Sequence, residues 1–437
     1  MRLVEFASAV AALLSVARGA IRQLPLPTAC DGVPSLRFPG TVASGWSVMK
    51  IAGNLRNVRT VVWDTNGNML VAEAGKGISV HTFGDDGCIN SSATLIANTQ
   101  LNHGLALTPD GTTLYASGER SAWSWTYDPN ARTVANQKTV ITGMDSGVHS
   151  TRTLMVVRSQ PNMVLVQVGS NSNLDMPSAQ PSTGRAIIKI FDMSKAPASG
   201  YNYKTAGEVF AYGLRNEIGF VQDPSGVVWG VENSGDDFRV NNQDIHTDNP
   251  AEKLNNLGDP LTKRDAWYGY PTCFSVWSTQ PFSSRNLKTG NQFMLAAGNG
   301  VSSDADCATK ATAPRLTFPA HTAPIWNAFN ADASNMYVTL HGSWDRQPPQ
   351  GFKVVEIPFR RLGNGTGASY DPVAPSDSQT GFRDVFSAPN PANCKANGLT
   401  QSNCIRLTAA AWDPSGRGLF VGSDNSAEGE IYILSRK

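Results

Sequence analysis

The sequence predicts an all-β fold, a six-bladed β-propeller with four-stranded antiparallel blades. One short pattern, a turn followed by an apolar strand, occurs six times along the chain of 437 residues. The copies lie about 70 residues apart on average, which suits one four-stranded sheet with its loops per copy. Hardly any stretch shows helical periodicity, and Gly and Pro punctuate the strands throughout. Self-similarity at so long a period is typical of a propeller.

Each copy of the pattern places Asp, Pro, Asn or Gly in a turn before a run of β-branched, aromatic and other apolar residues. Such residues favour a turn that leads into a fully buried strand. The copies are DTNGNMLVAEA from Asp64, TPDGTTLYASG from Thr108, SQPNMVLVQVG from Ser159, DPSGVVWGVEN from Asp223, ADASNMYVTLHG from Ala331 and DPSGRGLFVGSD from Asp413. We therefore expect one such strand in every blade.

The interval between the fourth and fifth copies is longer than the others and contains Cys273, Cys307 and the polar stretch 241–260. We expect inserted loops here, since long irregular segments in compact domains are usually functional or disordered. A separate small domain is the alternative. No Ser/Thr/Pro-rich linker lies at either end, so we expect residues 20–437 to form one propeller without an appended module.

The first 19 residues are typical of a secretory signal peptide. Arg2 precedes the apolar run FASAVAALLSV, and small residues surround the expected cleavage after Gly19. No later stretch has the ~18 uncharged apolar residues of a transmembrane helix. We expect a secreted, extracellular monomer that does not enter the membrane.

Six cysteines follow the expected cleavage site, and an even number in an exported chain favours three disulfides. Their connectivity is formally open, but proximity in the sequence favours the pairs Cys394–Cys404, Cys273–Cys307 and Cys30–Cys88. Because no CxxC pair exists, metal binding by these cysteines is not expected. The sequons at Asn90 and Asn364 could each carry a glycan, and the sequence leaves their use open.

Charge and motifs exclude two classes of ligand. The formal net charge is +1 at pH 7, and loss of Arg2, Glu5 and Arg18 with the signal peptide brings it to zero. Without a basic run, nucleic acid is not expected as a partner. No GxGxxG opens a helix and no GxxxxGK[ST] is present, so nucleotide cofactors lack support.

Polar residues beside the repeated strands are candidates for a binding site, because a propeller gathers the ends of its innermost strands around a central channel. They are Arg59, His103, His149, Arg152, Arg215, Asn216, Asn327, His341 and Arg406. Arginine stays charged, so several guanidinium groups in one cavity would repel each other unless an anion lay among them. The set predicts a polycarboxylate or phosphate ligand, although a single arginine is more often paired with an acid.

A general base and a calcium site are also expected. His149 directly precedes a predicted strand, and an ordinary imidazole pKa near ~6.5 suits a base. His103, His321 and His341 compete for this role, and the residues alone do not decide among them. Residues 232–237 cluster carboxylate and carbonyl oxygens, which suits Ca²⁺, with a solvated acidic turn as the alternative.

Three motifs identify a family resemblance. YGLRNEIGF at 212–220, HGSWDR at 341–346 and WYGYPTC at 267–273 resemble motifs of the soluble quinoprotein glucose dehydrogenase and L-sorbosone dehydrogenase superfamily. The resemblance covers most of the mature chain. With a secretion signal and three cysteine pairs, the chain is similar to fungal pyrroloquinoline quinone (PQQ)-dependent pyranose dehydrogenases.

The resemblance implies a quinoprotein oxidoreductase with PQQ and Ca²⁺ in the channel. It would oxidise a sugar hydroxyl, at C1, by proton abstraction and hydride transfer. The resemblance makes His149 the general base, gives Arg215 the stabilisation of charge on the quinone oxygen, and places Asn216 beside the cofactor. Calcium would bind the main-chain carbonyls of Ser234 and Gly235.

The resemblance also implies anchors for the cofactor's carboxylates. Arg406 matches an arginine that holds one of them, and Arg59 and Arg346 are further expected anchors, since three carboxylates need several bidentate partners. The sequence departs from the family pattern in two places. The family's second arginine is Thr408 here, and its cofactor lysine has no clear equivalent near Trp344.

We expect a mono- or oligosaccharide substrate and an external electron acceptor, which could be a cytochrome, a quinone or a copper oxygenase. A Ca²⁺-dependent propeller lactonase or other hydrolase is one alternative, but it needs metal-bound carboxylates rather than an arginine-rich cavity. A non-catalytic glycan-binding propeller is another, and would repeat aromatic platforms in every blade. The tryptophans do not repeat in that way.

Overall fold

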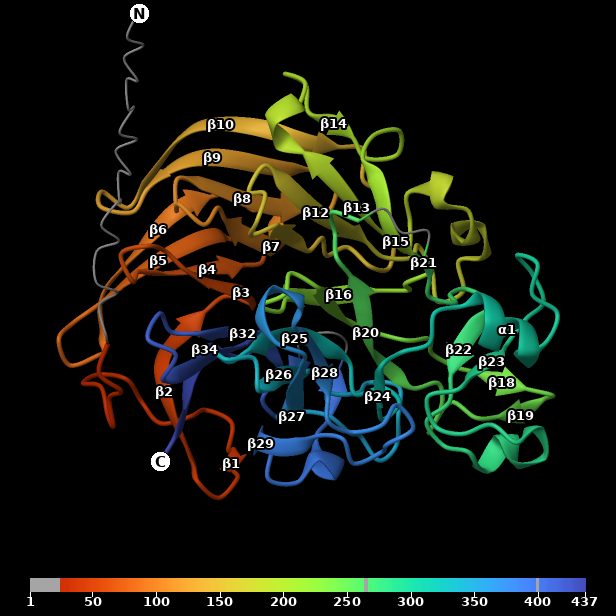
Figure 1. The fold of residues 1–437 in the computed structure, drawn as a ribbon. Helices are drawn as coiled ribbons and strands as arrows, with labels where there is room; N and C mark the ends of the chain where they lie inside the picture. Colours follow the sequence, from red (N-terminus) through yellow and green to blue (C-terminus); the bar gives the residue numbers. More distant parts are fainter. Residues whose placement is uncertain (1–23, 263–265, 398–400) are drawn as a thin grey trace, which may run out of the picture.

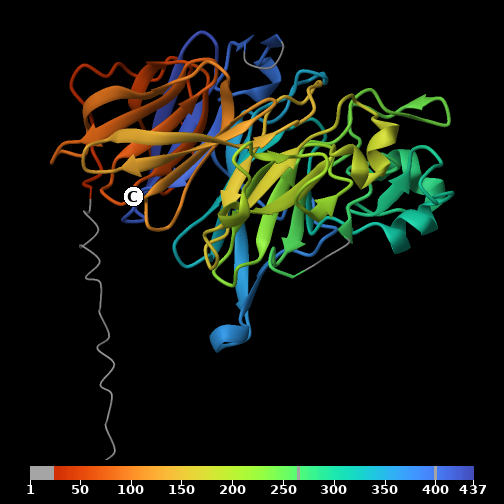
Figure 2. The ribbon, with the colours of Figure 1, turned by 90° about the horizontal axis from the view of Figure 1, so that it is seen from above.

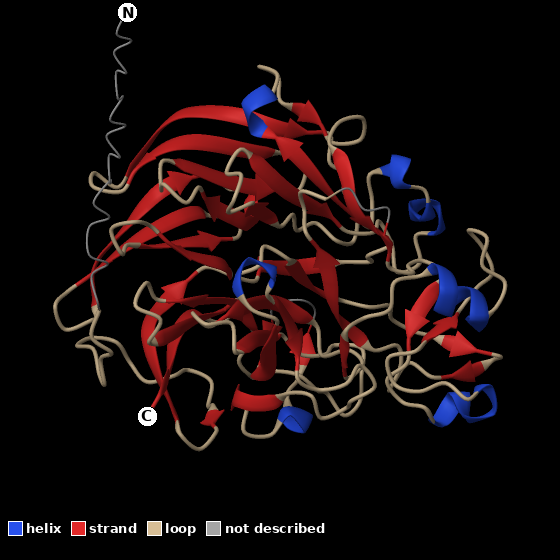
Figure 3. Ribbon diagram, in the orientation of Figure 1, coloured by secondary structure: helices blue, strands red, loops and turns tan. Residues whose placement is uncertain are grey.

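The structure is a computed structural model that describes residues 24–262, 266–397 and 401–437. The predicted signal peptide, residues 1–19, lies outside the described residues. Strands are the main regular structure of the described chain, and the helices are few and short (Figures 1 and 3). Six sheets surround a central channel, which confirms the predicted six-bladed propeller. Among the described residues, no helix is both long enough and apolar enough to cross a bilayer.

Each blade is named here by its innermost strand, and the first three follow one another along the chain. The β3 blade contains β3 (Val58–Trp63), β4 (Met69–Glu73), β5 (Gly77–Phe83) and β6 (Ile89–Ala97). The β7 blade contains β7 (Leu101–Leu107), β8 (Thr113–Gly118), β9 (Ala122–Asp128), β10 (Thr133–Thr142) and β14 (Tyr201–Asn202). The β11 blade contains β11 (Leu154–Val156), β12 (Met163–Val168), β13 (Ile187–Asp192), β15 (Glu208–Tyr212) and β21 (Ala266–Trp267).

The other three blades complete the ring. The β16 blade contains β16 (Glu217–Gln222), β17 (Val228–Glu232), β20 (Glu252–Gly258) and β24 (Leu316–Phe318). The β25 blade contains β25 (Pro324–Phe329), β26 (Asn335–Leu340), β27 (Lys353–Leu362), β29 (Arg383–Ser387) and β1 (Thr41–Val42), with β28 (Ser369–Pro372) paired to β27. The β32 blade contains β32 (Leu407–Trp412), β33 (Gly418–Ser423), β34 (Gly429–Arg436) and β2 (Trp46–Leu55).

The ring is closed by strands from both halves of the sequence. β2 pairs antiparallel with β34, so an early strand completes the blade that contains the end of the chain (Figure 1). The inner strands contact one another in the order β16, β25, β32, β3, β7 and β11. Since closure leaves few free strand edges, the blades hold their inner strands in fixed register around the channel.

The six repeated turns join the first and second strands of the blades, and the apolar runs after them form β4, β8, β12, β17, β26 and β33. These second strands are almost fully buried, which confirms the predicted buried strand in every blade. In five of the six turns an aspartate side chain accepts a backbone N–H bond from a residue that follows it. The bonds run to Asp64 from Asn66 at 2.9 Å, to Asp110 from Thr112 at 3.1 Å, to Asp223 from Ser225 at 2.8 Å, to Asp332 from Ser334 at 3.0 Å and to Asp413 from Arg417 at 2.8 Å. The repeated Asp thus supplies acceptors for backbone N–H groups of the turn that have no backbone partner.

The long interval forms β20 and β24 of the β16 blade and an insertion beside it. The insertion contains β18 (Arg239–Val240), β19 (Gln243–Asp244), β22 (Cys273–Ser275), β23 (Gln292–Met294), the 3₁₀ helix η4 (Gln280–Arg285) and the α-helix α1 (Asp304–Lys310). It lies to one side of the ring, next to the β16 and β11 blades (Figures 1 and 3). Its apolar residues pack together with Ala186 near the start of β13, so the insertion shares a core with the propeller.

Short elements and disulfides complete the fold. The remaining elements are the pair β30 (Ala396–Asn397) and β31 (Gln401–Ser402) and the 3₁₀ helices η1 (Met176–Ala179), η2 (Pro181–Thr183), η3 (Met193–Lys195), η5 (Gly365–Gly367) and η6 (Pro391–Asn393). Disulfides join Cys30–Cys88, Cys273–Cys307 and Cys394–Cys404, which confirms the three predicted pairs. The end of the β27–β28 hairpin projects from the body (Figure 2), and the sequon asparagine Asn364 is exposed at its tip.

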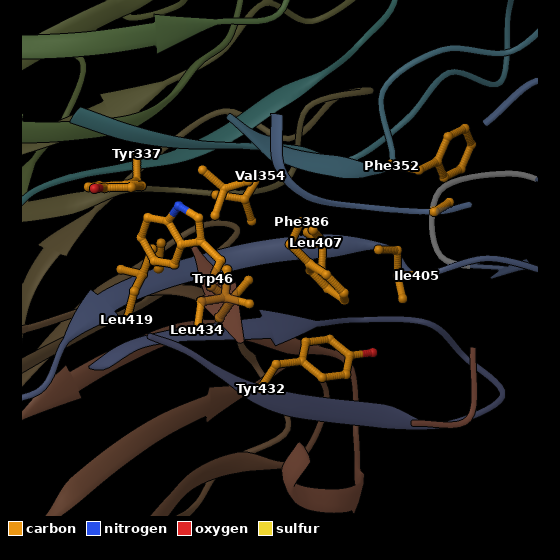
Figure 4. Packing of buried hydrophobic residues seen from close by; sticks show 14 of the residues in the cluster. Trp46, Tyr337, Phe352, Val354, Phe386, Ile405, Leu407, Leu419, Tyr432 and Leu434 are labelled. Atoms are coloured by element: carbon orange, nitrogen blue, oxygen red, sulfur yellow. The ribbon is translucent and has the colours of Figure 1, made fainter. Parts of the chain in front are cut away.

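The hydrophobic core lies between neighbouring blades. Between the β25 and β32 blades, Trp46, Tyr337 and Leu419 belong to one buried cluster, and the Trp46 and Tyr337 rings meet edge to face (Figure 4). Another link between blades is polar. The Tyr127 hydroxyl on β9 donates to Asp64 Oδ2 in the turn of the β3 blade at 2.7 Å, and both side chains are buried.

We predict that Tyr127→Phe lowers the free energy of unfolding by about 1–2 kcal/mol, because it leaves a buried carboxylate short of one donor. Urea-induced unfolding of the two proteins measures this difference. Tyr201→Phe is the matched control, since its half-buried hydroxyl donates only to the Asp192 carbonyl, and it should cost less. Equal losses for the two variants would contradict the assignment of Tyr127 as a link between blades.

Candidate functional site

Polar side chains from all six blades meet in one cavity of about 490 Å³ at the mouth of the channel. Its volume falls in the range of small-molecule sites, roughly 300–1,000 Å³. The lining includes Arg59, Asn102, His149, Arg215, Asn216, Ser234, Asp236, Asp237, Glu252, His321, His341, Trp344 and Arg406. Residues that are far apart in the sequence, from Arg59 to Arg406, therefore line the same cavity.

One side of the cavity, called the basic half here, contains Arg59, His341 and Arg406 above a fully buried carboxylate, Asp424. Arg59 pairs with Asp424, and the His341 Nε2 lies 2.7 Å from the other oxygen of the same carboxylate. Burial opposes ionisation of Asp424, but His341, Arg59 and Arg406 outweigh it and lower its pKa. Asp424 is thus an anion between two cations, so this half keeps a net positive charge.

The opposite side, called the acidic half here, contains Ser234, Asp236, Asp237, Glu252 and His321. The Glu252 carboxylate accepts the Ser234 backbone N–H at 2.6 Å and so orients the loop after β17. Burial raises the pKa of Glu252 to about 7. Burial opposes the charge on His321, but the nearby Asp236 and Glu252 carboxylates outweigh it and raise its pKa.

Part of the acidic half could hold a metal ion. Possible ligand atoms of Asp236, His321 and Asp345 lie within 4.8 Å of one another. The same Asp236 carboxylate also pairs with Arg215 Nη2 at 2.7 Å. Carboxylate and carbonyl oxygens in a cluster of this kind suit a hard divalent cation.

His149 faces the cavity from the segment before β11. Its Nδ1 lies 2.9 Å from the Ser170 carbonyl oxygen, which can only accept, so Nδ1 carries the proton and Nε2 keeps a lone pair. Burial and then the Arg215 charge lower the pKa of His149 to about 3. The imidazole is therefore neutral near pH 7, and its Nε2 is able to accept a proton.

Arg215 and Asn216 lie directly before β16, where the chain enters the channel. Glu232 accepts the Arg215 backbone N–H at 2.8 Å, and the guanidinium donates to Asn173 Oδ1 at 3.0 Å. These contacts hold the Arg215 side chain toward the cavity beside His149. Asn216 accepts a bond from Gln167 at 3.2 Å, which fixes its amide next to the same strand end.

The structure brings together six of the predicted site residues: Arg59, His149, Arg215, Asn216, Ser234 and Arg406. It places Arg346 and Gly235 outside the lining. The Arg346 guanidinium pairs with Asp248 at 2.7 Å and donates to the Pro348 carbonyl at 3.0 Å, so its charge is already compensated away from the cavity. Gly235 packs under the Phe238 ring, where a Cβ atom would come within 2.4 Å of the ring.

Three other residues that the sequence offered as candidates bind backbone carbonyls next to the site. His103 is fully buried and its Nε2 contacts the Ile218 carbonyl across the channel at 3.3 Å. Arg152 donates to the His149 carbonyl at 2.7 Å, and Asn327 donates to the Trp229 carbonyl at 2.9 Å. These side chains satisfy backbone oxygens instead of facing a ligand.

Sequence reasoning missed Asp424, Glu252 and Asn173. Asp424 ends the sixth repeated string, DPSGRGLFVGSD, so a polar residue directly after a buried strand was the available signal. Its partner Arg59 lies 365 residues earlier, and only closure of the ring places the two together. Trp344 lines the cavity mouth and is half exposed, at 52%.

The TrAA12-like family model matches residues 40–437. The chain is 40% identical over 414 residues to a pyrroloquinoline quinone-dependent pyranose dehydrogenase of Coprinopsis cinerea, an alignment that covers 93% of this chain and 56% of that protein. The chain thus spans about half the length of that relative.

Two solved structures are similar to the whole fold. The holo form of the pyranose dehydrogenase PQQ domain from Coprinopsis cinerea has a TM-score of 0.88 and 40% identity, covering 93% of this chain and 99% of that chain. The calcium structure of Trichoderma reesei Carbohydrate-Active Enzymes Family AA12 has a TM-score of 0.84 and 35% identity, covering 92% of this chain and 99% of that chain.

The raised pKa of Glu252 predicts a pH-dependent stability. Between about pH 4.5 and about pH 7 the folded protein keeps a proton that the unfolded chain has lost, so stability falls as pH rises through this window, by about 3 kcal/mol. Glu252→Gln should remove this slope. Unfolding free energies measured with a chelator at several pH values test it, with the exposed Glu208→Gln as control. A variant with the slope of the parent protein would contradict the assignment.

Proposed function

The chain belongs to the TrAA12-like family, and from this premise we propose that it is a PQQ-dependent sugar dehydrogenase, a quinoprotein oxidoreductase. The observation that carries the proposal is one cavity in which a neutral, oriented imidazole lies beside cationic groups from separate blades. Similarity to a PQQ-dependent pyranose dehydrogenase over 93% of the chain supports the same activity.

The donors of the basic half fit a polycarboxylate cofactor. Arg59 and Arg406 would hold carboxylates of PQQ, because guanidinium groups donate in a fixed fork that matches a carboxylate. In this half of the cavity Arg59 and Arg406 carry two positive charges, against the single negative charge of Asp424. Asn216 would contact the cofactor from its place directly before β16.

The acidic half fits the calcium ion that the cofactor would share. The Ser234 carbonyl would supply a main-chain oxygen and Asp236 would supply negative charge beside it, whereas Gly235 lies outside the lining. Oxygen ligands of this kind suit Ca²⁺. The similar Trichoderma reesei structure is a calcium structure, which supports the same choice of ion.

His149 would act as the general base. Its neutral Nε2 faces the cavity and takes the proton of the sugar hydroxyl, while Nδ1 stays bonded to the Ser170 carbonyl. When bound, PQQ would supply the two-electron acceptor for the hydride of the sugar carbon that bears this hydroxyl. We propose that this carbon is C1. The proton and the hydride together account for the oxidation of the alcohol.

Arg215 would stabilise the charge that develops in this step. Its guanidinium is fixed by Asn173 and Asp236 before any ligand arrives, so little reorganisation is needed. The half-exposed Trp344 offers a surface on which a sugar ring could stack. The disulfides fit an oxidising compartment, so we propose a secreted protein that passes electrons to an external acceptor.

Reconstitution tests the proposed function. Purified protein treated with a chelator should bind PQQ and oxidise aldoses with an artificial electron acceptor only after Ca²⁺ is returned. A panel of pyranoses with and without PQQ measures the dependence. Sugar oxidation that does not require PQQ would refute the proposal, and so would the failure of PQQ to bind.

Within that assay, His149→Ala should keep the PQQ affinity of the parent protein and lower kcat by about 10²–10⁴, because a general base contributes that much. His81→Gln is the control, since its imidazole lies between Ser79 and Ser92 in the β3 blade, outside the cavity. Unchanged turnover in His149→Ala would assign the base to another group.

Two arginine substitutions separate cavity anchors from other buried arginines. Arg406→Lys should raise the Kd for PQQ about tenfold or more, because lysine cannot make the forked contact. Arg346→Lys should leave that Kd unchanged, because Arg346 lies outside the cavity lining and pairs with Asp248. Fluorescence titration with PQQ measures both values. An equal loss in the two variants would mean that Arg346 is an anchor as well.

A further inference from the structure

A second imidazole, His341, lines the cavity and has no part in the steps above. It follows β26 as the first residue of the HGSWDR motif, and its backbone N–H donates to the Ala323 carbonyl at 2.9 Å. Its side chain is 7% exposed, and the Asp424 side chain bonded to it is fully buried. A ring held this firmly at a cavity wall can present one atom to a ligand in a fixed direction.

The contact with Asp424 decides which nitrogen of His341 carries the proton. The Nε2 lies 2.7 Å from Asp424 Oδ1, and an ionised carboxylate can only accept, so Nε2 is the donor. Burial first and the Arg406 charge next lower the pKa of His341 to about 4, so the ring is neutral near pH 7. The Nδ1 therefore carries a lone pair, and no described residue hydrogen-bonds to it.

The charges around His341 restrict what this lone pair can meet. Arg59 and Arg406 both lie close enough to affect its titration, and both offer donors to anionic groups of a ligand. A carboxylate oxygen placed on Nδ1 would face another lone pair and would be repelled. A ligand group that contacts this nitrogen, beside the groups that bind the arginines, would therefore be an N–H or O–H donor.

We propose that His341 Nδ1 accepts a hydrogen bond from the pyrrole N–H of the bound cofactor and that Asp424 is the positioning residue that fixes this tautomer. The inference rests on the proposed function, since PQQ is the ligand concerned. PQQ carries one pyrrole N–H, and carboxylates lie on both sides of it. A fixed acceptor next to two guanidinium groups matches that arrangement of one donor between two anions.

Three substitutions at His341 isolate the acceptor. His341→Asn places an amide oxygen where Nδ1 was, and should keep most of the affinity for PQQ. His341→Gln reaches Asp424 with its amide but lacks the acceptor, and His341→Phe keeps only the ring. Each of these two should raise the Kd for PQQ about tenfold, as expected for one lost hydrogen bond. Titration of the apoprotein by tryptophan fluorescence, without sugar, measures Kd directly.

A double-mutant cycle tests the role of Asp424. Asp424→Asn also weakens the pairing with Arg59, so the informative quantity is the change that it causes in two backgrounds. If Asp424 acts through His341, its substitution raises the Kd less in His341→Gln than in the parent protein. Equal effects in the two backgrounds would overturn the positioning role.

The outcomes distinguish this inference from the proposed function. If the parent protein fails to bind PQQ, the proposed function fails. If the parent protein binds PQQ and His341→Gln and His341→Phe bind it equally well, the inference is wrong while the function stands. A raised KM for the sugar with an unchanged Kd for PQQ would also overturn it, because the donor would then belong to the substrate. His81→Gln serves again as the control.

Discussion

Compensation of buried cationic charge determines how the cavity is built. A guanidinium group taken out of water is tolerated only where another part of the protein supplies an acceptor or an opposite charge. Arg59 has Asp424, Arg215 has Asp236 and Asn173, and Arg406 donates to the Gly342 carbonyl at 2.9 Å. Each partner comes from another blade or loop, so the cavity exists only when the ring is closed.

Closure depends on the pairing of β2 with β34. That pairing places β33, with Asp424 directly after it, beside β3, which carries Arg59. The apolar cluster around Trp46 and Tyr432 fills the space between the sheets and holds this geometry (Figure 4). The electrostatics of the cavity therefore depend on the packing between blades. A loss of register at the closing blade would separate Arg59 from its counter-ion, Asp424.

The division of the cavity into a basic and an acidic half has a functional meaning under the proposed activity. Anionic groups of a ligand are attracted to Arg59 and Arg406, while a cation is attracted to Asp236 and its neighbours. A cofactor that bears carboxylates and shares a metal ion would be oriented by this difference before any specific contact forms. His149 and Arg215 then lie together at one wall, where the proton and the developing charge of the reaction would be handled.

The sequence by itself determined the repeated strands, because turn-forming residues before apolar runs act locally and each copy carries its own evidence. It also favoured the disulfide pairs, through their proximity in the chain, and indicated six of the residues that meet in the cavity, because polar groups beside inner strands often face a propeller's channel. His103, Arg152 and Asn327 occupy similar positions but bond backbone oxygens instead. Only the tertiary structure decided which buried arginine charges are compensated, and which residues compensate them. His341 and Arg346 belong to one six-residue motif, yet one lines the cavity and the other pairs with Asp248, because a loop turns between them. Contacts between blades depend on closure of the whole ring, and no local pattern of residues encodes that.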